Sequence, residues 1–272
     1  MAEICLLDGA MGTELMKRGA EPGRFPEALN LTAPEIVRAI HRDYVEAGSR
    51  LIYACTFGAN PVKARGADVA PVVAAALENA RAAAGDRARV ALDAGPRGQL
   101  LEPYGDLTEE EARAAYRTVF AAGAEADLVV LETFFDLTEA LLALEEARDL
   151  LPGKPCFVTM TFQKNGRTLT GVAVEEMAEA LEEAGADAVG LNCSLGPVEA
   201  LPLVRALRAA TALPLVVKPN AGMPDPVTGA YPMDAAAFAE AMVPVLELGA
   251  AYAGGCCGTD PEYIRMLARS IR

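Results

Sequence analysis

Two adjacent cysteines stand near the end of the chain, in the segment GGCCGT at residues 254–259. A disulfide between neighbouring cysteines is strained, so Cys256 and Cys257 are not expected to pair with each other. The glycines around them let the backbone bend so that both sulfurs can face one partner. A third cysteine, Cys193, follows another short apolar run. Three thiolates with one free corner make a suitable open site for zinc, which prefers sulfur ligands and tetrahedral geometry.

Such a site is suited to reactions of a substrate thiol. Three thiolates offset the charge of Zn²⁺ and leave it a weak activator of water, whereas a soft fourth ligand such as a substrate thiol still binds well. A vicinal redox pair formed by Cys256 and Cys257 is the alternative, and it requires no metal. The remaining cysteines are expected to be small apolar core residues; they are Cys5, Cys55 and Cys156.

Composition excludes several classes of function. The 272 residues carry a formal net charge of −14, which argues against nucleic acid or an anionic membrane as a partner. There is a single histidine, His41; it stands in a helical pattern and is expected to be structural, so catalysis by a Ser-His-Asp or Cys-His set is excluded. No apolar run reaches the roughly 20 residues of a membrane span, and no signal-peptide pattern opens the chain. A cytoplasmic protein is expected.

The elements that must position these residues alternate regularly. Short apolar runs alternate with longer helical stretches rich in Ala, Glu and Leu. Eight runs are strand candidates, at residues 4–10, 50–57, 90–96, 127–134, 155–162, 188–194, 214–222 and 252–257. Each is followed by a helical segment, the first after a long loop. This alternation predicts an α/β fold, a (β/α)8 TIM barrel, as one domain over residues 1–272. An open doubly wound sheet is the alternative.

Several helix ends are marked in the sequence. The segments TAPE (32–35) and TDPE (259–262) predict capping boxes with proline in the first turn. The segment DLTEEEARAAY opens with Asp and Thr and places acidic residues in the first turn of a helix. Glycines in AGAD (184–187) and ELGA (247–250) predict helix ends that lead into strands.

The barrel prediction places the functional site at the carboxyl ends of the strands. Cys193 ends the sixth strand and the cysteine pair ends the eighth, so a single strand separates them in a closed ring. We therefore expect the three sulfurs to converge. Polar residues at other strand ends are candidates for the same site: Asp8, Thr56, Asn60, Asp93, Glu132, Asn192 and Asn220.

Motifs along nearly the whole chain resemble those of the zinc-dependent homocysteine S-methyltransferases. The residues of these motifs are most similar to those of the homocysteine-binding domain of cobalamin-dependent methionine synthase. The motifs are LLDGAMGTEL (6–15), NLTAPEIVRAIHRDYVEAGS (30–49), TFGAN (56–60), LETFFDLTEA (131–140), GLNCSLGP (190–197), KPNAGMP (218–224) and GGCCGTDPEYI (254–264).

The resemblance implies a role for each matching residue. Cys193, Cys256 and Cys257 would bind one Zn²⁺ per chain and act in catalysis through it, and Asn220 would supply an oxygen to zinc when substrate is absent. Asp8 and Glu132 would hold the ammonium group of homocysteine. The other implied substrate-binding residues are Gly9, Ala10, Gly12 and Thr13, whose backbone amides would face the carboxylate, and Thr56, Asn60 and Asn192 as weaker members of the pocket.

Each of these residues also has a purely structural interpretation. Asp8 and Glu132 could be ordinary carboxylates at strand ends that cap a neighbouring loop. Asn192 could order a loop, and Asp93 and Arg97 could only shape the third one.

The implied reaction is transfer of a methyl group to the thiol of homocysteine, giving methionine. Cobalamin modules of methionine synthases carry an Asp-x-His-x-x-Gly motif, which the surroundings of His41 do not match. A corrinoid is therefore expected only as an external donor, as a separate methyl-corrinoid protein or methylcobalamin. S-methylmethionine is the alternative donor, and a non-catalytic zinc- or thiol-binding module of a larger assembly is the alternative function. Residues 221–233 are expected to form an ordered loop or lid over the barrel mouth.

Overall fold

The computed structural model describes residues 4–21 and 23–271, and in that part of the chain it contains eight parallel strands. The strands are β1 (Cys5–Leu6), β2 (Leu51–Tyr53), β3 (Arg89–Ala94), β4 (Leu128–Phe134), β5 (Cys156–Met160), β6 (Ala188–Asn192), β7 (Leu215–Lys218) and β8 (Ala250–Ala253). All lie within the apolar runs predicted from the sequence, apart from the ends of β3 and β8.

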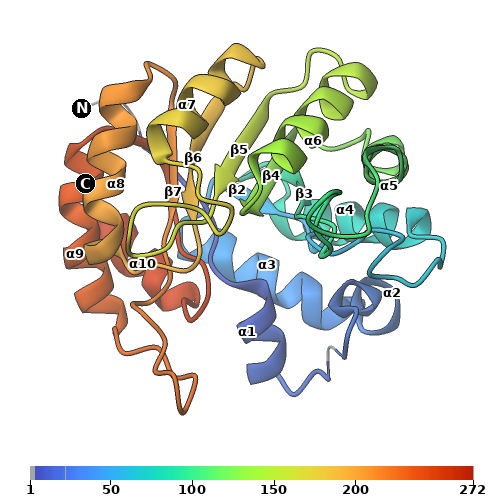
Figure 1. Cartoon of the computed structure of the whole chain (residues 1–272). Helices are drawn as coiled ribbons and strands as arrows, with labels where there is room; N and C mark the ends of the chain where they lie inside the picture. The colour runs from blue at the N-terminus through green and yellow to red at the C-terminus, as the bar shows by residue number, and fades with distance from the viewer. Residues whose placement is uncertain (1–3, 22, 272) are drawn as a thin grey trace.

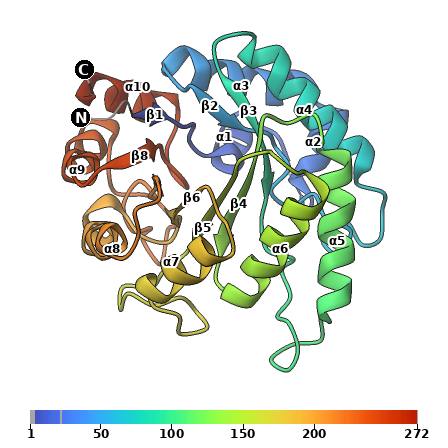
Figure 2. The same cartoon turned by 90° about the horizontal axis from the view of Figure 1, so that it is seen from above.

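The strands form a nearly closed ring. Their order is β1-β8-β7-β6-β5-β4-β3-β2, and every neighbouring pair is parallel. The remaining gap between β1 and β2 is bridged by the pair Leu7 and Leu51 and by a hydrogen bond of 2.8 Å from Arg50 N to Leu6 O. Figure 2 shows the helices arranged around these strands. The predicted TIM barrel is confirmed, and the open sheet is not formed.

Each strand after the first is followed by one long helix. The helices are α1 (Met11–Lys17), α2 (Leu29–Thr32), α3 (Pro34–Ala47), α4 (Ala70–Ala84), α5 (Glu109–Ala122), α6 (Leu137–Leu150), α7 (Val174–Glu183), α8 (Pro197–Ala210), α9 (Ala235–Glu247) and α10 (Pro261–Ser270), with a 3₁₀ turn, η1, at Pro26–Ala28. The segment between β1 and α3, expected to be a long loop, contains α1, η1 and α2. Figure 1 shows α1, α2 and the tip of the 221–233 segment on the same side of the barrel.

The predicted helix ends are partly correct. Thr108 and Glu111 form the capping box of α5, and Gly185 and Gly249 take positive φ angles of 87° and 90° after α7 and α9. Both predicted capping boxes are wrong, although the predicted prolines, Pro34 and Pro261, do stand at the first position of α3 and α10. The helix α3 begins after Ala33, because Thr32 already belongs to α2.

The second wrong capping box is that of α10. Its N-cap is Asp260, whose side chain accepts from Glu262 N. The hydroxyl of Thr259 instead donates to Cys256 O at 2.7 Å. The Thr259 side chain therefore stabilises the cysteine segment and does not cap α10.

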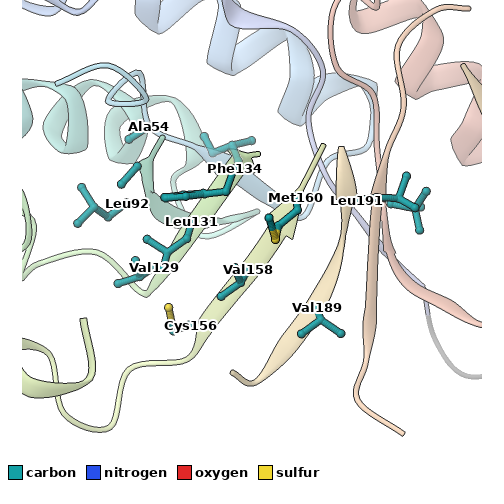
Figure 3. Packing of buried hydrophobic residues seen from close by; sticks show 14 of the residues in the cluster. Ala54, Leu92, Val129, Leu131, Phe134, Cys156, Val158, Met160, Val189 and Leu191 are labelled. Atoms are coloured by element: carbon teal, nitrogen blue, oxygen red, sulfur yellow. The ribbon is translucent and has the colours of Figure 1, made fainter. Parts of the chain in front are cut away.

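The core has two layers because strand side chains alternate between the two faces of the sheet. Leu128, Val130 and Phe157 belong to a buried cluster inside the barrel. Val129 and Val158 belong to a second buried cluster on the outer face of the sheet, and Figure 3 shows their side chains among others of this cluster. The outer cluster also holds Cys55 and Cys156, whereas Cys5 packs against the inner one. In the part of the chain that the structure describes, no helix has the length and apolar character needed to cross a membrane.

Candidate metal centre and substrate cavity

Three cysteine sulfurs meet at one end of the barrel. Cys193 directly follows β6, and Cys256 and Cys257 follow β8, with only β7 between these strands. The three Sγ atoms lie within 4.8 Å of one another, and those of Cys193 and Cys257 are 3.8 Å apart. The convergence predicted from the strand order is confirmed.

The carboxyl end of β7 holds the two cysteine segments together through backbone hydrogen bonds. Cys193 N donates to Lys218 O at 3.1 Å, and Cys256 N donates to Pro219 O at 2.8 Å. Ala221 N donates to Cys257 O at 3.0 Å. The three thiols therefore sit on a frame of three strands, and their positions do not depend on a mobile loop.

The glycines near the cysteine pair serve mainly to provide space. A Cβ atom at Gly255 would lie 2.4 Å from Thr259 Oγ1, and one at Gly254 would lie 2.5 Å from Asp8 O. Only Gly258, with φ 83°, takes a backbone conformation that favours glycine. The conformational freedom of glycine is therefore needed only at Gly258, after the cysteine pair. Gly254 and Gly255, before the pair, are needed because a larger side chain would not fit there. Cys193 itself has φ 61°, a strained value for a residue with a side chain.

The cysteine cluster fits a tetrahedral metal ion. Two sulfurs that each lie about 2.3 Å from one tetrahedral zinc are about 3.8 Å apart, which matches the separation of Cys193 and Cys257. The side-chain oxygen of Asn220, at the end of β7, is buried without a hydrogen-bond partner in the described part of the chain. A buried oxygen of this kind needs a donor or a cation, which agrees with the oxygen ligand expected at Asn220.

The cluster already favours a thiolate. Hydrogen bonds from the thiols of Cys193 and Cys256 lower the pKa of Cys257 well below its usual range. Hydrogen bonds to the two neighbouring sulfurs, together with burial, raise the pKa of Cys256. For Cys193 the hydrogen bond with Cys256 lowers the pKa, but the hydrogen bond to Cys257 and burial outweigh it and raise the pKa. A divalent cation displaces such protons when it binds, since thiolates and not thiols are its ligands.

A cavity of about 330 Å³ opens next to the three cysteines. Its wall includes all three cysteines and six of the predicted substrate-binding residues: Asp8, Gly9, Ala10, Gly12, Thr13 and Glu132. Thr56, Asn60 and Asn192 do not line it. The cavity belongs to the carboxyl ends of the strands, as expected for a barrel.

Glu132 lies on the cavity wall, and the side-chain amide of Asn192 contacts its carboxylate. Asn192 Nδ2 donates to Glu132 Oε2 at 3.3 Å and lies 4.0 Å from Cys256 Sγ. Burial raises the pKa of Glu132 from 4.5 to about 7, and the nearby charges of Lys218 and Asp8 act on it in opposite directions. Asn192 therefore stands behind the wall and joins the carboxylate side of the cavity to the cysteine side.

Asp8 lines the cavity, but both of its carboxylate oxygens are already engaged. Lys218 Nζ donates to Asp8 Oδ1 at 2.8 Å, and Tyr53 N donates to Asp8 Oδ2 at 2.7 Å. The side chains of Asp8 and Lys218 are each only 5% exposed. The Lys218 ammonium also lies 3.6 Å from the centre of the Tyr53 ring, a favourable contact for a buried cation.

Thr56 and Asn60 have structural partners. The Thr56 hydroxyl donates to Asp93 O at 2.7 Å and accepts from Asp93 N at 3.1 Å. Asn60 Oδ1 accepts from Lys63 N at 2.9 Å. Thr56 thus fixes the backbone of Asp93, which does line the cavity.

Sequence reasoning missed several residues of the wall and left one undecided. Glu27, Tyr53 and Lys218 were not expected there, and Asp93 was a candidate whose alternative role was only to shape a loop. A lysine at the carboxyl end of an apolar run, as in LVVKPN, is a signal that could have been used, because that end of a barrel strand faces the site. The backbone hydrogen bond from Tyr53 to Asp8 leaves no signal in the sequence.

Residues 221–233 form an ordered loop beside the cysteine pair. Met233 N donates to Ala221 O at 3.1 Å, which closes the base of the loop. The ring of Tyr231 packs on Gly258, since a Cβ atom there would lie 2.3 Å from Tyr231 Cγ. The loop therefore covers the residue next to Cys257, as expected for a lid at this position.

Comparison with known families agrees with this site. The sequence profile described as homocysteine S-methyltransferase matches residues 5–271. The chain belongs to the homocysteine S-methyltransferase family. Members of this family are methyltransferases, and the motif GGCCGT and Cys193 lie within the matched residues.

Curated relatives of this family member include two mycobacterial methionine synthases. The protein of Mycobacterium leprae (strain TN) is 34% identical over 298 residues, and that of Mycobacterium tuberculosis (strain ATCC 25618 / H37Rv) is 33% identical over 293 residues. In both cases the alignment covers 97% of this chain and 24% of the relative. The chain thus spans about a quarter of the length of these relatives.

Solved structures of the homocysteine methyltransferase MmuM from Escherichia coli have the same fold as this family member. The oxidized form matches with a TM-score of 0.84 and 27% identity, covering 98% of this chain and 95% of that one. The metallated form matches with a TM-score of 0.83 and 26% identity, covering 98% and 96%. The likeness therefore extends over nearly the whole of both chains.

Proposed function

We propose that the protein transfers a methyl group from an external donor to the thiol of homocysteine and depends on one zinc ion per chain. The observation that carries this proposal is the cluster of Cys193, Cys256 and Cys257 on the wall of an acidic cavity, in a member of the homocysteine S-methyltransferase family. The sulfur spacing and the unpartnered oxygen of Asn220 support zinc as the ion.

The three cysteines hold the centre of the reaction. When bound, zinc lowers the pKa of a substrate thiol and keeps its sulfur electron-rich and fixed in place. The proton of the thiol leaves to water, so no side-chain base is needed at the sulfur. His41, the single histidine, is fully buried and is not part of the cavity.

The rest of the cavity orients the amino acid. Its acidic wall, which includes Glu132, takes the ammonium group of homocysteine. The backbone amides from Gly9 to Thr13 face the substrate carboxylate, and α1 begins at Met11 without a side-chain cap on its first amides. The Thr13 hydroxyl is buried and has no partner among the described residues, so it is free to donate to the same carboxylate.

Methyl transfer then needs only alignment. The substrate sulfur attacks the methyl carbon in line, the new S–C bond forms as the bond between methyl and donor breaks, and the leaving group keeps the electron pair. With a methyl-corrinoid the leaving group is cob(I)alamin; with S-methylmethionine it is a neutral sulfide. Positioning of the two reactants supplies most of the rate enhancement in such a displacement.

A methyl-corrinoid, carried by a separate protein or free as methylcobalamin, is the donor that we favour. The similarity to methionine synthases supports this choice.

S-methylmethionine remains the second candidate donor. The match to the Escherichia coli homocysteine methyltransferase covers nearly all of both chains, so the same barrel also occurs in a homocysteine methyltransferase that is not described as a methionine synthase. A non-catalytic module that only binds zinc or thiols is the candidate from another class.

The test uses purified, zinc-loaded protein with homocysteine and each donor in turn. With methylcobalamin, the corrinoid spectrum and methionine are followed; with S-methylmethionine, methionine alone. We expect turnover well above the rate without enzyme. Cys257→Ser should lose bound zinc and activity, whereas Cys156→Ser, at a buried cysteine of the outer core, should keep its zinc.

Each outcome separates the candidates. Turnover with S-methylmethionine alone would replace the favoured donor. Stoichiometric zinc without turnover from either donor would favour the non-catalytic module. A protein that binds no zinc but has a titratable dithiol at Cys256 and Cys257 would contradict the proposal and favour a redox pair.

A further inference from the structure

The cavity contains more carboxylates than cations. Four acidic side chains line it, Asp8, Glu27, Asp93 and Glu132, against one cationic side chain, Lys218. A buried carboxylate that lacks a cation or hydrogen-bond donor is destabilising. The partners of each carboxylate therefore indicate where the cavity still requires a positive charge.

Two of the four carboxylates have internal partners. Asp8 is bonded to Lys218 and to Tyr53 N, which occupies both of its oxygens. Glu27 Oε1 accepts from Gly58 N at 2.6 Å, and the charge of Lys63 favours its ionised form, whereas its Oε2 is buried without a partner within the described residues. Burial opposes the charge of Lys218, but the carboxylate of Asp8 outweighs this effect and raises the pKa of the lysine. The lysine is thus a permanent cation.

The other two carboxylates form no ion pair within the described residues, although the charge of Lys218 favours the ionised form of both. Asp93 is only 5% exposed, and its Oδ1 is buried without a hydrogen-bond partner within the described residues. Glu132 has one amide contact, the 3.3 Å bond from Asn192. Burial raises the pKa of Asp93 well above its ordinary value, and the charge of Glu132 raises it further. Both groups would be stabilised by the same incoming cation.

The position of Asp93 is fixed before any ligand arrives. It lies in β3, and Thr56 binds both its backbone N–H and its carbonyl oxygen. Glu132 lies in the neighbouring strand β4, which pairs with β3 in parallel. The two carboxylates therefore come from adjacent strand ends on a rigid part of the barrel, which suits a preorganised receptor.

We propose that Lys218 is the built-in counter-ion of Asp8, and that Asp93 together with Glu132 receives the ammonium group of the thiol substrate. The proposal rests on the proposed function, which supplies a substrate carrying both a thiol and an ammonium group. Asp8 and Lys218 are then positioning residues, and Asp93 is a substrate-binding residue that determines specificity for amino thiols.

The probe for this proposal is 4-mercaptobutanoic acid, which has the thiol, the chain length and the carboxylate of homocysteine but no amine. Binding of both thiols to zinc-loaded protein is measured by calorimetry, and the ratio of the two Kd values is the amine preference. We expect wild-type protein to prefer homocysteine at least tenfold. Asp93→Asn should weaken homocysteine binding about tenfold and leave the affinity for the analogue within twofold.

The control is Glu27→Gln, which changes a lining carboxylate outside the proposed pair: it stands in η1, away from β3 and β4, and Gly58 N donates to its Oε1. It should leave the amine preference unchanged. An Asp93→Asn variant that weakens both thiols equally, or neither, would overturn the assignment of Asp93.

A second variant separates Asp93 from Asp8. Lys218→Met alone leaves Asp8 buried without its cation, so it should lower the melting temperature. The double variant Asp8→Asn with Lys218→Met removes both charges; it should recover most of that stability and keep the amine preference within threefold. Loss of the preference in the folded double variant would make Asp8 the receptor and overturn the proposal.

Failure of this inference is distinguishable from failure of the proposed function. A zinc-loaded protein that methylates homocysteine and the analogue equally well would retain its function and have no ammonium receptor. A zinc-loaded protein that binds neither thiol would overturn both.

Discussion

The side-chain amide of Asn192 makes two hydrogen bonds to Thr133 on the neighbouring side of the cavity. Its Oδ1 accepts from Thr133 N at 2.8 Å, and its Nδ2 donates to Thr133 Oγ1 at 2.7 Å. Thr133 has φ 62°, a value that a β-branched residue adopts only under constraint. This contact holds the end of β4, including Glu132, against the end of β6, from which Cys193 extends.

Removal of this amide should release the strained residue. Asn192→Ala leaves the partly buried polar groups of Thr133 without this partner, so we expect a loss of about 1–2 kcal/mol of stability. Urea unfolding measures it. Thr133→Gly in the Asn192→Ala background should recover part of the loss, because glycine adopts positive φ without strain. If the double variant recovers no stability, the Asn192 amide does not act by holding Thr133 at its positive φ.

The space around the cysteine pair gives a second prediction. In Gly255→Ala the new methyl group meets the fully buried Thr259, so we expect a loss of about 1–3 kcal/mol and weaker zinc binding. Thermal unfolding and the zinc content of the purified variant measure the two effects. Gly12→Ala is the control for stability, since no atom lies within 4 Å of its new methyl group. Equal destabilisation by both variants would contradict the steric argument.

His41 predicts how stability depends on pH. Its full burial lowers its pKa from 6.5 to about 4, and neither ring nitrogen has a hydrogen-bond partner among the described residues. Between these values the unfolded chain binds a proton that the folded chain does not. The contribution is therefore complete above pH 6.5 and decreases by about 3 kcal/mol as the pH falls to 4.

The check is chemical unfolding of wild-type protein and His41→Leu at several pH values. The stability difference between the two should change over the window from pH 6.5 to 4, with the variant less sensitive to acid. Parallel stability curves would mean that His41 does not titrate differently in the folded state.

Glu132 predicts a pH dependence of substrate selection. Burial raises its pKa to about 7, and only its ionised form attracts an ammonium group. The preference for homocysteine over 4-mercaptobutanoic acid should therefore increase as the pH rises from 6 to 8. Because both thiols lose a proton on binding zinc, the ratio of their Kd values isolates the carboxylate.

The matching variant is Glu132→Gln, which retains the size of the side chain and cannot ionise. We expect it to lower the amine preference about tenfold at pH 8, comparable to the loss of one charge-assisted contact, and to remove the increase with pH. A variant that keeps the same rise would assign the titration to another group.

The sequence by itself determined the barrel and the convergence of the three cysteines. Alternation of apolar runs and helical stretches allows few topologies, and the site of a parallel barrel lies at the carboxyl ends of its strands. That rule alone brings Cys193 and the pair at 256–257 together. The type of residue then decides the chemistry, because three thiols are suited to few ligands other than a soft metal ion.

Only the tertiary structure decided how the carboxylates are shared. Asp8 and Lys218 are 210 residues apart in the sequence. They meet because β1 pairs with β8, and β8 pairs with β7, which ends at Lys218. Thr56 is turned toward the backbone of Asp93 and away from the cavity for the same reason. Local propensity and period identify which end of a strand a residue occupies. They do not identify which oxygen is already bonded, because that depends on contacts between distant segments that form only when the barrel is complete.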